Sequence, residues 1–197
     1  MDRSAIEQGI YEAAIVPERW PAVLADLTQA SGARGGVLFS LSDVGSTWIA
    51  DPGLHAAREI ANIPVLGLCE SAMHIACMMG ANFSFVTINE KFTPRVVENV
   101  DRYGLRSRFV GASRMRIERL TDLGSGFAPG PIQDEIVSQF NAAARKNTDN
   151  GAEVVIAAGG VVMALLAHAG IHATEDGVPI LNGITNLVKL GEMGGPQ

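Results

Sequence analysis

Apolar residues along the chain alternate between short continuous runs and longer stretches at helical spacing. The runs predict strands at 35–41, 63–68, 82–88, 108–113, 152–158 and 178–181. The stretches predict helices that include residues 4–15, 70–79, 93–103, 132–146 and 184–193, with a Gly/Pro loop at 124–131. Strands that alternate with helices indicate βαβ units. The pattern therefore predicts an α/β fold with a parallel sheet.

Ligands of open parallel sheets bind beyond the carboxyl ends of the strands. Six segments follow predicted strands or lie at such ends, namely 48–53, 69–71, 87–91, 113–116, 158–162 and 182–185. We expect the functional residues of this protein among them.

The composition narrows the classes of partner. Of the 197 residues 47% are hydrophobic and 18% are charged, which is globular and excludes disorder. The net charge is −6 and no basic cluster is present, so we expect no nucleic-acid partner. The longest uncharged apolar stretch, 154–167, is too short for a membrane span. No secretory signal is recognisable, so we expect a cytoplasmic protein with a small-molecule substrate.

Glu70 and His74 are the candidate catalytic pair. They lie four residues apart at the start of a predicted helix and therefore share one helix face. A carboxylate beside an imidazole can orient it for general acid/base chemistry. The alternative is a first-turn glutamate that favours the helix dipole, next to a solvated or packed histidine.

Small polar residues and glycines at other strand ends are the candidate substrate-binding groups. They are Ser71, Thr87, Asn89, Gly159 and Gly160. The glycine pair lets the backbone approach a ligand, and its N–H groups can form an anion nest. The alternatives are a helix cap at Thr87 and Asn89, and a plain tight turn at Gly159 and Gly160.

The two cysteines, Cys69 and Cys77, are most simply small core residues. Two thiols alone cannot make a metal site, and a cytoplasmic disulfide is not expected. Cys69 precedes a helix, and a helix N-terminus can lower a thiol pKa. The sequence has neither GxGxxG nor the lysine of a P-loop, so no metal and no cofactor is expected.

Residues 51–192 resemble the aspartate/glutamate/hydantoin racemase superfamily, and the hydantoin and allantoin racemase branch in particular. The likeness is carried by the segments DPGLHAAREI, ANIPVLGLCESAMHIA, FSFVTI, VVENVDRYGLRSRF, GAEVVIAAGGVVMALLA and GVPILNGITNLVKL. The combination of DPGL, IPV-x-G-x-x-E and YGL-x-x-R is its most specific part. We therefore expect a racemase-like α/β domain over 46–197.

The resemblance implies two α/β lobes and a cleft in which two cysteines face the substrate Cα. One thiolate would remove the proton, and the other thiol would return one on the opposite face. Trp48 and Gly159 stand at about the places of these cysteines. The usual two-thiol reaction is therefore not expected in this chain.

The N-terminal part departs from that family. Residues 6–41 resemble, more weakly, the opening of the sensory region of LuxR-type transcription regulators. We therefore expect a divergent helical and strand segment over 1–45 and a first lobe that is truncated or replaced.

Two functions follow from these observations. The first is a racemase-type isomerase that moves a proton at the carbon next to a carboxylate or hydantoin carbonyl, with an amino acid or a derivative as substrate. The alternative is a small-molecule-binding or regulatory module that has kept the fold without the reaction.

A shortened lobe would leave a sheet edge or an apolar patch exposed, so the sequence predicts a homo-oligomer. Light scattering over about a hundredfold dilution should then give a mass above that of one chain at the higher concentrations. A monomer at every concentration would contradict this expectation.

Overall fold

The computed structural model describes residues 22, 23, 26, 51, 53–60, 64–88, 90–117 and 122–194. The helices are α3 (Leu54–Ile60), α4 (Leu68–Met79), α5 (Phe92–Arg102), α6 (Asp122–Ser125), α7 (Pro131–Thr148), α8 (Gly160–His168) and α9 (Gly183–Gly194), with a 3₁₀ turn at Arg106–Arg108. The strands are β1 (Phe83–Thr87), β2 (Phe109–Arg114), β3 (Val154–Ala158) and β4 (Ile180–Leu181). The expectations for residues 1–45 fall almost wholly outside the described residues and stay predictions.

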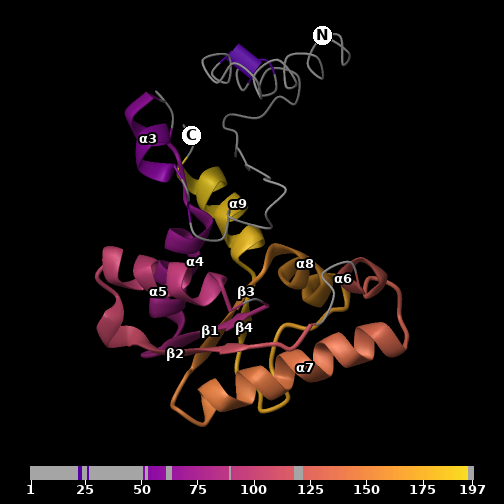
Figure 1. Cartoon of the computed structure of the whole chain (residues 1–197). Coiled ribbons are helices and arrows are strands. Elements are labelled where there is room, and N and C mark those ends of the chain that lie inside the picture. Colours follow the sequence, from indigo (N-terminus) through magenta and orange to yellow (C-terminus); the bar gives the residue numbers. More distant parts are fainter. Residues whose placement is uncertain are drawn as a thin grey trace.

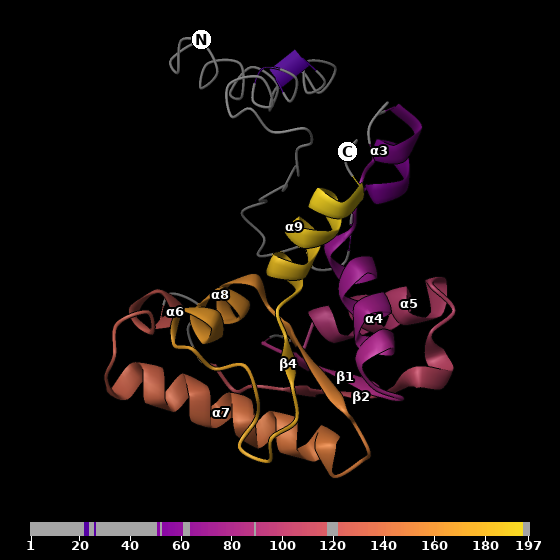
Figure 2. The same cartoon turned by 180° about the vertical axis from the view of Figure 1, so that it is seen from behind.

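The four strands form one parallel sheet in the order β2-β1-β3-β4. Helix α7 lies along one face, and α4 and α5 lie along the other (Figures 1 and 2). The α/β class and the parallel sheet expected from the sequence are confirmed. Helices α3 and α9 extend away from the sheet on the side of α4 (Figure 1).

The strands of the sheet centre are buried on both faces, which explains their continuous apolar runs. Phe85 belongs to the core with α4 and α5, whereas its neighbour Val86 packs with α7 and α8. This division follows from the two-residue period of a strand, which sends successive side chains to opposite faces. Phe83 and Phe85 are 0% and 1% exposed, and their rings meet edge to face.

Two sequence-based expectations need correction. Residues 63–68 were expected to form a strand, but 64–67 have no regular structure and Leu68 already belongs to α4. A strand needs a neighbour for its N–H and C=O groups, and no described strand pairs with this segment. The loop expected at 124–131 is partly helical, because α6 extends through Ser125 and α7 begins at Pro131.

Arg108 fastens the end of α4 to the start of β2. Its guanidinium donates to the carbonyl oxygens of Cys77 (2.9 Å) and Gly80 (2.6 Å), and also to that of Ala81. The last carbonyls of a helix have no partner within the helix. Arg108, the final residue of the YGL-x-x-R motif, therefore completes the C-terminus of α4.

No helix among the described residues combines the length and the apolar composition that a bilayer crossing requires.

Asn147 joins α7 to the two strands beneath it. Its side-chain amide donates to the Phe85 carbonyl (2.9 Å), and its amide oxygen accepts from the Ser113 hydroxyl (2.7 Å). Asn147 is 3% exposed, and Asn147→Ala leaves the buried Phe85 carbonyl and the half-buried Ser113 hydroxyl without this partner. The substitution should therefore lower the free energy of unfolding by about 1–3 kcal/mol. Denaturant unfolding measures this loss. Asn150→Ala, at an exposed turn position, is the control and should change stability little.

Candidate functional site

The structure brings Thr87, Gly159 and Gly160 together at the carboxyl edge of the sheet. Thr87 pairs with Ala158 across β1 and β3, so the next residues of both strands are neighbours. A Cβ placed on Gly159 would lie 3.4 Å from Cγ2 of Ile88. Gly160 begins α8, and no side chain in the described part of the molecule caps this helix. Backbone N–H groups at such a helix start attract anions.

The other substrate-binding candidates lie in different settings. The Thr87 hydroxyl is hydrogen-bonded inside the protein, to the Thr93 hydroxyl (3.0 Å) and to the Ser113 carbonyl (3.4 Å). Ser71 is 6% exposed on α4. Asn89 lies outside the described residues. Gly159 and Gly160 are buried as well, and the Gly159 N–H donates to the Ala157 carbonyl (3.0 Å). The first turn of α8, where Val161 is exposed, is therefore the part of this edge that a ligand could reach.

Glu70 and His74 are carried by a different face of α4 from the one that meets α8 and α9. A Cβ on Gly183, the first residue of α9, would lie 3.2 Å from Leu68 and 3.4 Å from Ala72. Residues two positions further along an α-helix lie about 200° around its axis. Glu70 and His74 are therefore turned away from that junction.

Both members of the candidate pair have other neighbours. Each oxygen of the Glu70 carboxylate accepts from the Arg58 guanidinium, at 3.2 and 2.5 Å. His74 is exposed, and its ring centroid lies 6.3 Å from that of Tyr103. The structure therefore pairs Glu70 with Arg58 of α3 and places His74 beside Tyr103.

A buried carboxylate next to this pair was not among the individual candidates from the sequence. Asp51 is 8% exposed, and its carboxylate accepts from the backbone N–H groups of Cys69 (2.9 Å) and Glu70 (2.7 Å). It also accepts from the Tyr103 hydroxyl (3.0 Å). We call Asp51, Arg58, Glu70 and Tyr103 the Asp51 cluster. The motifs DPGL and YGL-x-x-R contained the signal, because Asp51 and Tyr103 stand in them.

Burial dominates the electrostatics of this cluster. It raises the pKa of Asp51 above the usual 3.8, although the three donated hydrogen bonds act in the opposite direction. The negative charge of Glu70 adds to the increase. Burial and the Asp51 carboxylate also raise the pKa of the Tyr103 hydroxyl, which therefore keeps its proton and donates a hydrogen bond to Asp51.

The pKa of Cys69 is shifted in the opposite direction from the one that its place before a helix suggested. Burial and the nearby Asp51 charge raise the pKa of its thiol to about 12. Its backbone N–H, at the helix start, is already bound to Asp51. Cys69 is thus a core residue without thiolate character, because desolvation outweighs the effect of the helix N-terminus.

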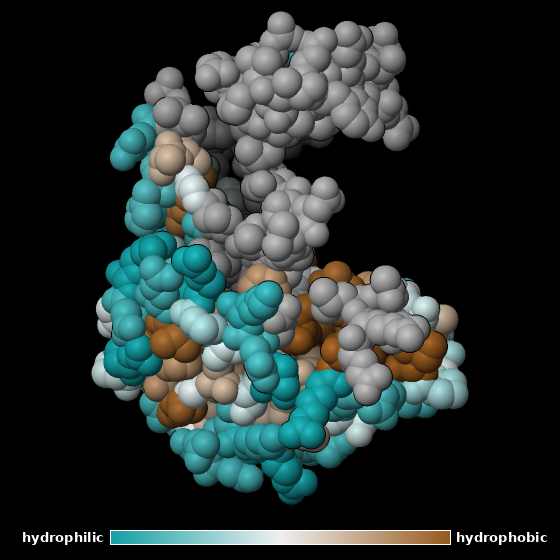
Figure 3. Space-filling model, viewed as in Figure 1, coloured by the Kyte–Doolittle hydropathy of each residue, from teal (hydrophilic) through white to brown (hydrophobic). Residues whose placement is uncertain are grey.

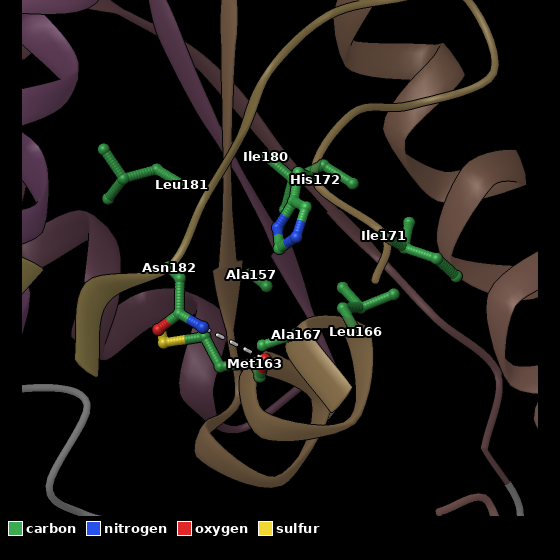
Figure 4. A pocket seen from close by; sticks show the side chains of 9 residues that line it. All are labelled: Ala157, Met163, Leu166, Ala167, Ile171, His172, Ile180, Leu181 and Asn182. Atoms are coloured by element: carbon green, nitrogen blue, oxygen red, sulfur yellow. Dashed lines mark hydrogen bonds between the residues drawn. The ribbon is translucent and has the colours of Figure 1, made fainter. Parts of the chain in front are cut away.

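A small cavity lies between α8 and β4 (Figure 4). Its walls are Ala157, Met163, Leu166, Ala167, Ile171, His172, Ile180, Leu181 and Asn182. Its volume of about 10 Å³ suits a single water. The Asn182 amide is committed to the Met163 carbonyl and to the Thr185 N–H, so the cavity is a packing feature and not a substrate site.

The surface around α8 is apolar. Hydrophobic residues gather over this helix on the face shown in Figure 3, whereas hydrophilic residues cover α5 and α7. Val161, in the first turn of α8, is 41% exposed. The start of α8, at the buried residues Gly159 and Gly160, therefore has an apolar border. Within the described ranges, no group of three or more His, Cys, Asp or Glu side chains could hold a metal ion.

Comparison with known proteins identifies the family. The model of the Asp/Glu/Hydantoin racemase family matches residues 7–191. The chain belongs to the Asp/Glu/hydantoin racemase family. The family match includes residues 7–50, which precede the segment on which the resemblance rests.

Individual relatives agree with this assignment. The chain is 30% identical to the hydantoin racemase of Rhizobium meliloti over 96% of its own length and 70% of the relative. It is also 30% identical to the hydantoin racemase of Pseudomonas sp. (strain NS671), over 72% of its own length and 53% of the relative. The chain thus spans about half of one relative and about seven tenths of the other.

Solved structures show the same fold. The allantoin racemase from Klebsiella pneumoniae matches with a TM-score of 0.64 and 27% identity, over 85% of this chain and 61% of that one. The allantoin racemase from Pseudomonas fluorescens matches with a TM-score of 0.58 and 20% identity, over 73% of this chain and 57% of that one. The racemase-like fold expected from the sequence is confirmed.

The raised thiol pKa of Cys69 predicts its reactivity. At neutral pH very little of a thiol with a pKa of about 12 is the reactive thiolate, and the side chain is 3% exposed. Iodoacetamide should therefore modify Cys69 in the folded protein far more slowly than a free cysteine, as measured by peptide mass spectrometry. In denaturant Cys69 and Cys77 should react alike. Rapid labelling of Cys69 in the folded protein would contradict its burial.

Proposed function

We propose that this protein is a racemase-type isomerase that transfers a proton at the carbon next to a carboxylate or hydantoin carbonyl. The observation that carries the proposal is the uncapped start of α8, where Gly159 and Gly160 follow β3 at the carboxyl edge of the sheet. Its N–H groups suit a carboxylate or imide oxygen of a small substrate. Family membership and the relatives named hydantoin racemase support the reaction class.

The remaining candidates take secondary roles in this proposal. Thr87 and Ser71 are buried and would support the site from within the protein, and Asn89 would line its substrate side. Glu70 and His74 would supply the acid and the base. Glu70 is bound to Arg58, so a proton taken up by its carboxylate would weaken that ion pair. A homo-oligomer and a cytoplasmic location remain predictions.

Two observations favour a second candidate, a binding module without turnover. Gly159 has no side chain where the resemblance implies a catalytic thiol, and Glu70 and His74 lie on a face of α4 turned away from the α8–α9 junction. Such a protein would bind the same small acids or hydantoins and leave them unchanged.

Proton exchange in D₂O separates the two candidates. The protein is incubated with aspartate, glutamate, allantoin and 5-substituted hydantoins, and NMR follows the Cα proton. Loss of signal above the protein-free rate supports the isomerase, and Glu70→Gln and His74→Ala then locate the base. If no substrate exchanges while titration of the protein amide spectrum shows binding, the second candidate is correct.

A thiol at position 159 tests the site itself. Gly159 has an extended φ of −168° and its Cβ would make only ordinary contacts, so Gly159→Cys should fold normally. If Gly159 faces the substrate, the new thiol should raise the exchange rate, and general acid–base groups typically contribute about 10²–10⁴-fold. Gly159→Ser is the control, because it has nearly the same size but no thiol. Equal rates in both variants would place the reacting carbon elsewhere.

A further inference from the structure

Asp51 combines two features that each cost free energy. Its φ of 49° lies in the left-handed region, where residues other than glycine are uncommon, and the next residue is a proline, which restricts its backbone further. Its carboxylate is also buried. Costs of this kind persist only where the surrounding structure fixes the residue, and they gather at functional sites.

Asp51 is fixed by contacts to two helices that are distant in sequence. Its two oxygens accept from the N–H groups of Cys69 and Glu70 at the start of α4, and from the hydroxyl of Tyr103 just after α5. Gly67 leaves the room for it, because a Cβ there would lie 2.6 Å from the Asp51 Oδ2. The DPGL, IPV-x-G-x-x-E and YGL-x-x-R motifs therefore meet at this one carboxylate.

We propose that Asp51 is a positioning residue for Glu70. Asp51 binds the Glu70 backbone N–H, and Arg58 binds the Glu70 carboxylate. Glu70 is therefore held both at its backbone and at the end of its side chain. Arg58 is itself anchored, because its Nε donates to the Val65 carbonyl at 3.0 Å. The consequence for catalysis rests on the proposed function, whereas the fixed geometry of the first turn of α4 does not.

The charges around Asp51 set the expected pH response. Glu70 and the Cys69 thiol from α4, the Arg58 guanidinium from α3 and the Tyr103 hydroxyl surround it. Its pKa in the folded state lies above the usual 3.8. The folded state therefore holds the proton more tightly than the unfolded chain. The contribution of this group to stability is full below about pH 3.8 and declines as the pH rises through its folded-state pKa.

An NMR titration of the backbone amides tests the contact without any need for activity. The amide signals of Cys69 and Glu70 should move together in one step centred above pH 3.8, as Asp51 ionises. Asp51→Asn should abolish this step. Asp101→Asn is the matched control and should keep it, because Asp101 is exposed and bound to Arg106. Amide signals that show no step, or a step that survives in Asp51→Asn, would overturn the proposal.

Tyr103→Phe provides a second variant if Asp51→Asn does not fold. The Tyr103 hydrogen bond lowers the pKa of Asp51, so its removal should move the same step to higher pH. An unmoved step in this variant would show that the hydroxyl does not act on Asp51.

The kinetic arm separates positioning from general stability. With a substrate that exchanges its Cα proton, Asp51→Asn should lower kcat about tenfold or more with KM little changed, since a misplaced base affects the chemical step rather than binding. Asp101→Asn should leave both constants unchanged. An equal kcat in Asp51→Asn and wild type would overturn the positioning role. Absence of exchange in the wild type would refute the proposed function instead, and the amide titration would still decide whether Asp51 holds Glu70.

Discussion

The buried carboxylate of Asp51 ties together three parts of this protein that are far apart in sequence. It occupies the N–H groups at the start of α4 and the hydroxyl that follows α5, and it belongs to the turn that leads into α3. A helix start needs acceptors for its N–H groups, and here no side chain next to α4 supplies them. A distant carboxylate does so at the cost of burial and of a left-handed backbone. Together with the Arg58–Glu70 ion pair, Asp51 therefore holds α3, α4 and the end of α5 to one another at this point.

The C-terminus of α4 is also bound by a side chain from a distant part of the sequence. Arg108, next to the start of β2, binds the carbonyl of Cys77 in the last turn of the helix and that of Gly80, which follows it. The helix that carries Glu70 and His74 is thus closed at both ends by side chains from elsewhere in the chain. This arrangement gives physical meaning to the motifs of the family resemblance, since DPGL and YGL-x-x-R contribute the residues that complete α4.

The carboxyl edge of the sheet has a different character from the Asp51 cluster. It contains the start of α8 at the buried residues Gly159 and Gly160, a buried hydroxyl at Thr87 and an apolar surface over α8 (Figure 3). The proposed function assigns the binding of a small anion to this edge, whereas Glu70 and His74 lie on a face of α4 turned away from the α8–α9 junction. Racemisation requires the anion-binding group and the acid/base groups to act on the same substrate molecule, around one carbon. Catalysis therefore requires the proposed anion-binding backbone and the acid/base groups to lie close together, whereas simple binding does not.

The sequence by itself determined the α/β class, the places of the four described strands and a helix after β3, because buried parallel strands leave short continuous apolar runs. The apolar run at 63–68 shows that such a run can also lead into a helix without forming a strand. The sequence also indicated the family, because each of the motifs that carry the resemblance is a short continuous segment of sequence. It could not show that 64–67 would remain without a strand partner, since pairing is decided by which strands are neighbours in space. Nor could it show that Glu70 would bind Arg58, or that Cys69 would be too buried to ionise. Those outcomes depend on distances between segments and on desolvation, and only the tertiary structure sets either of them.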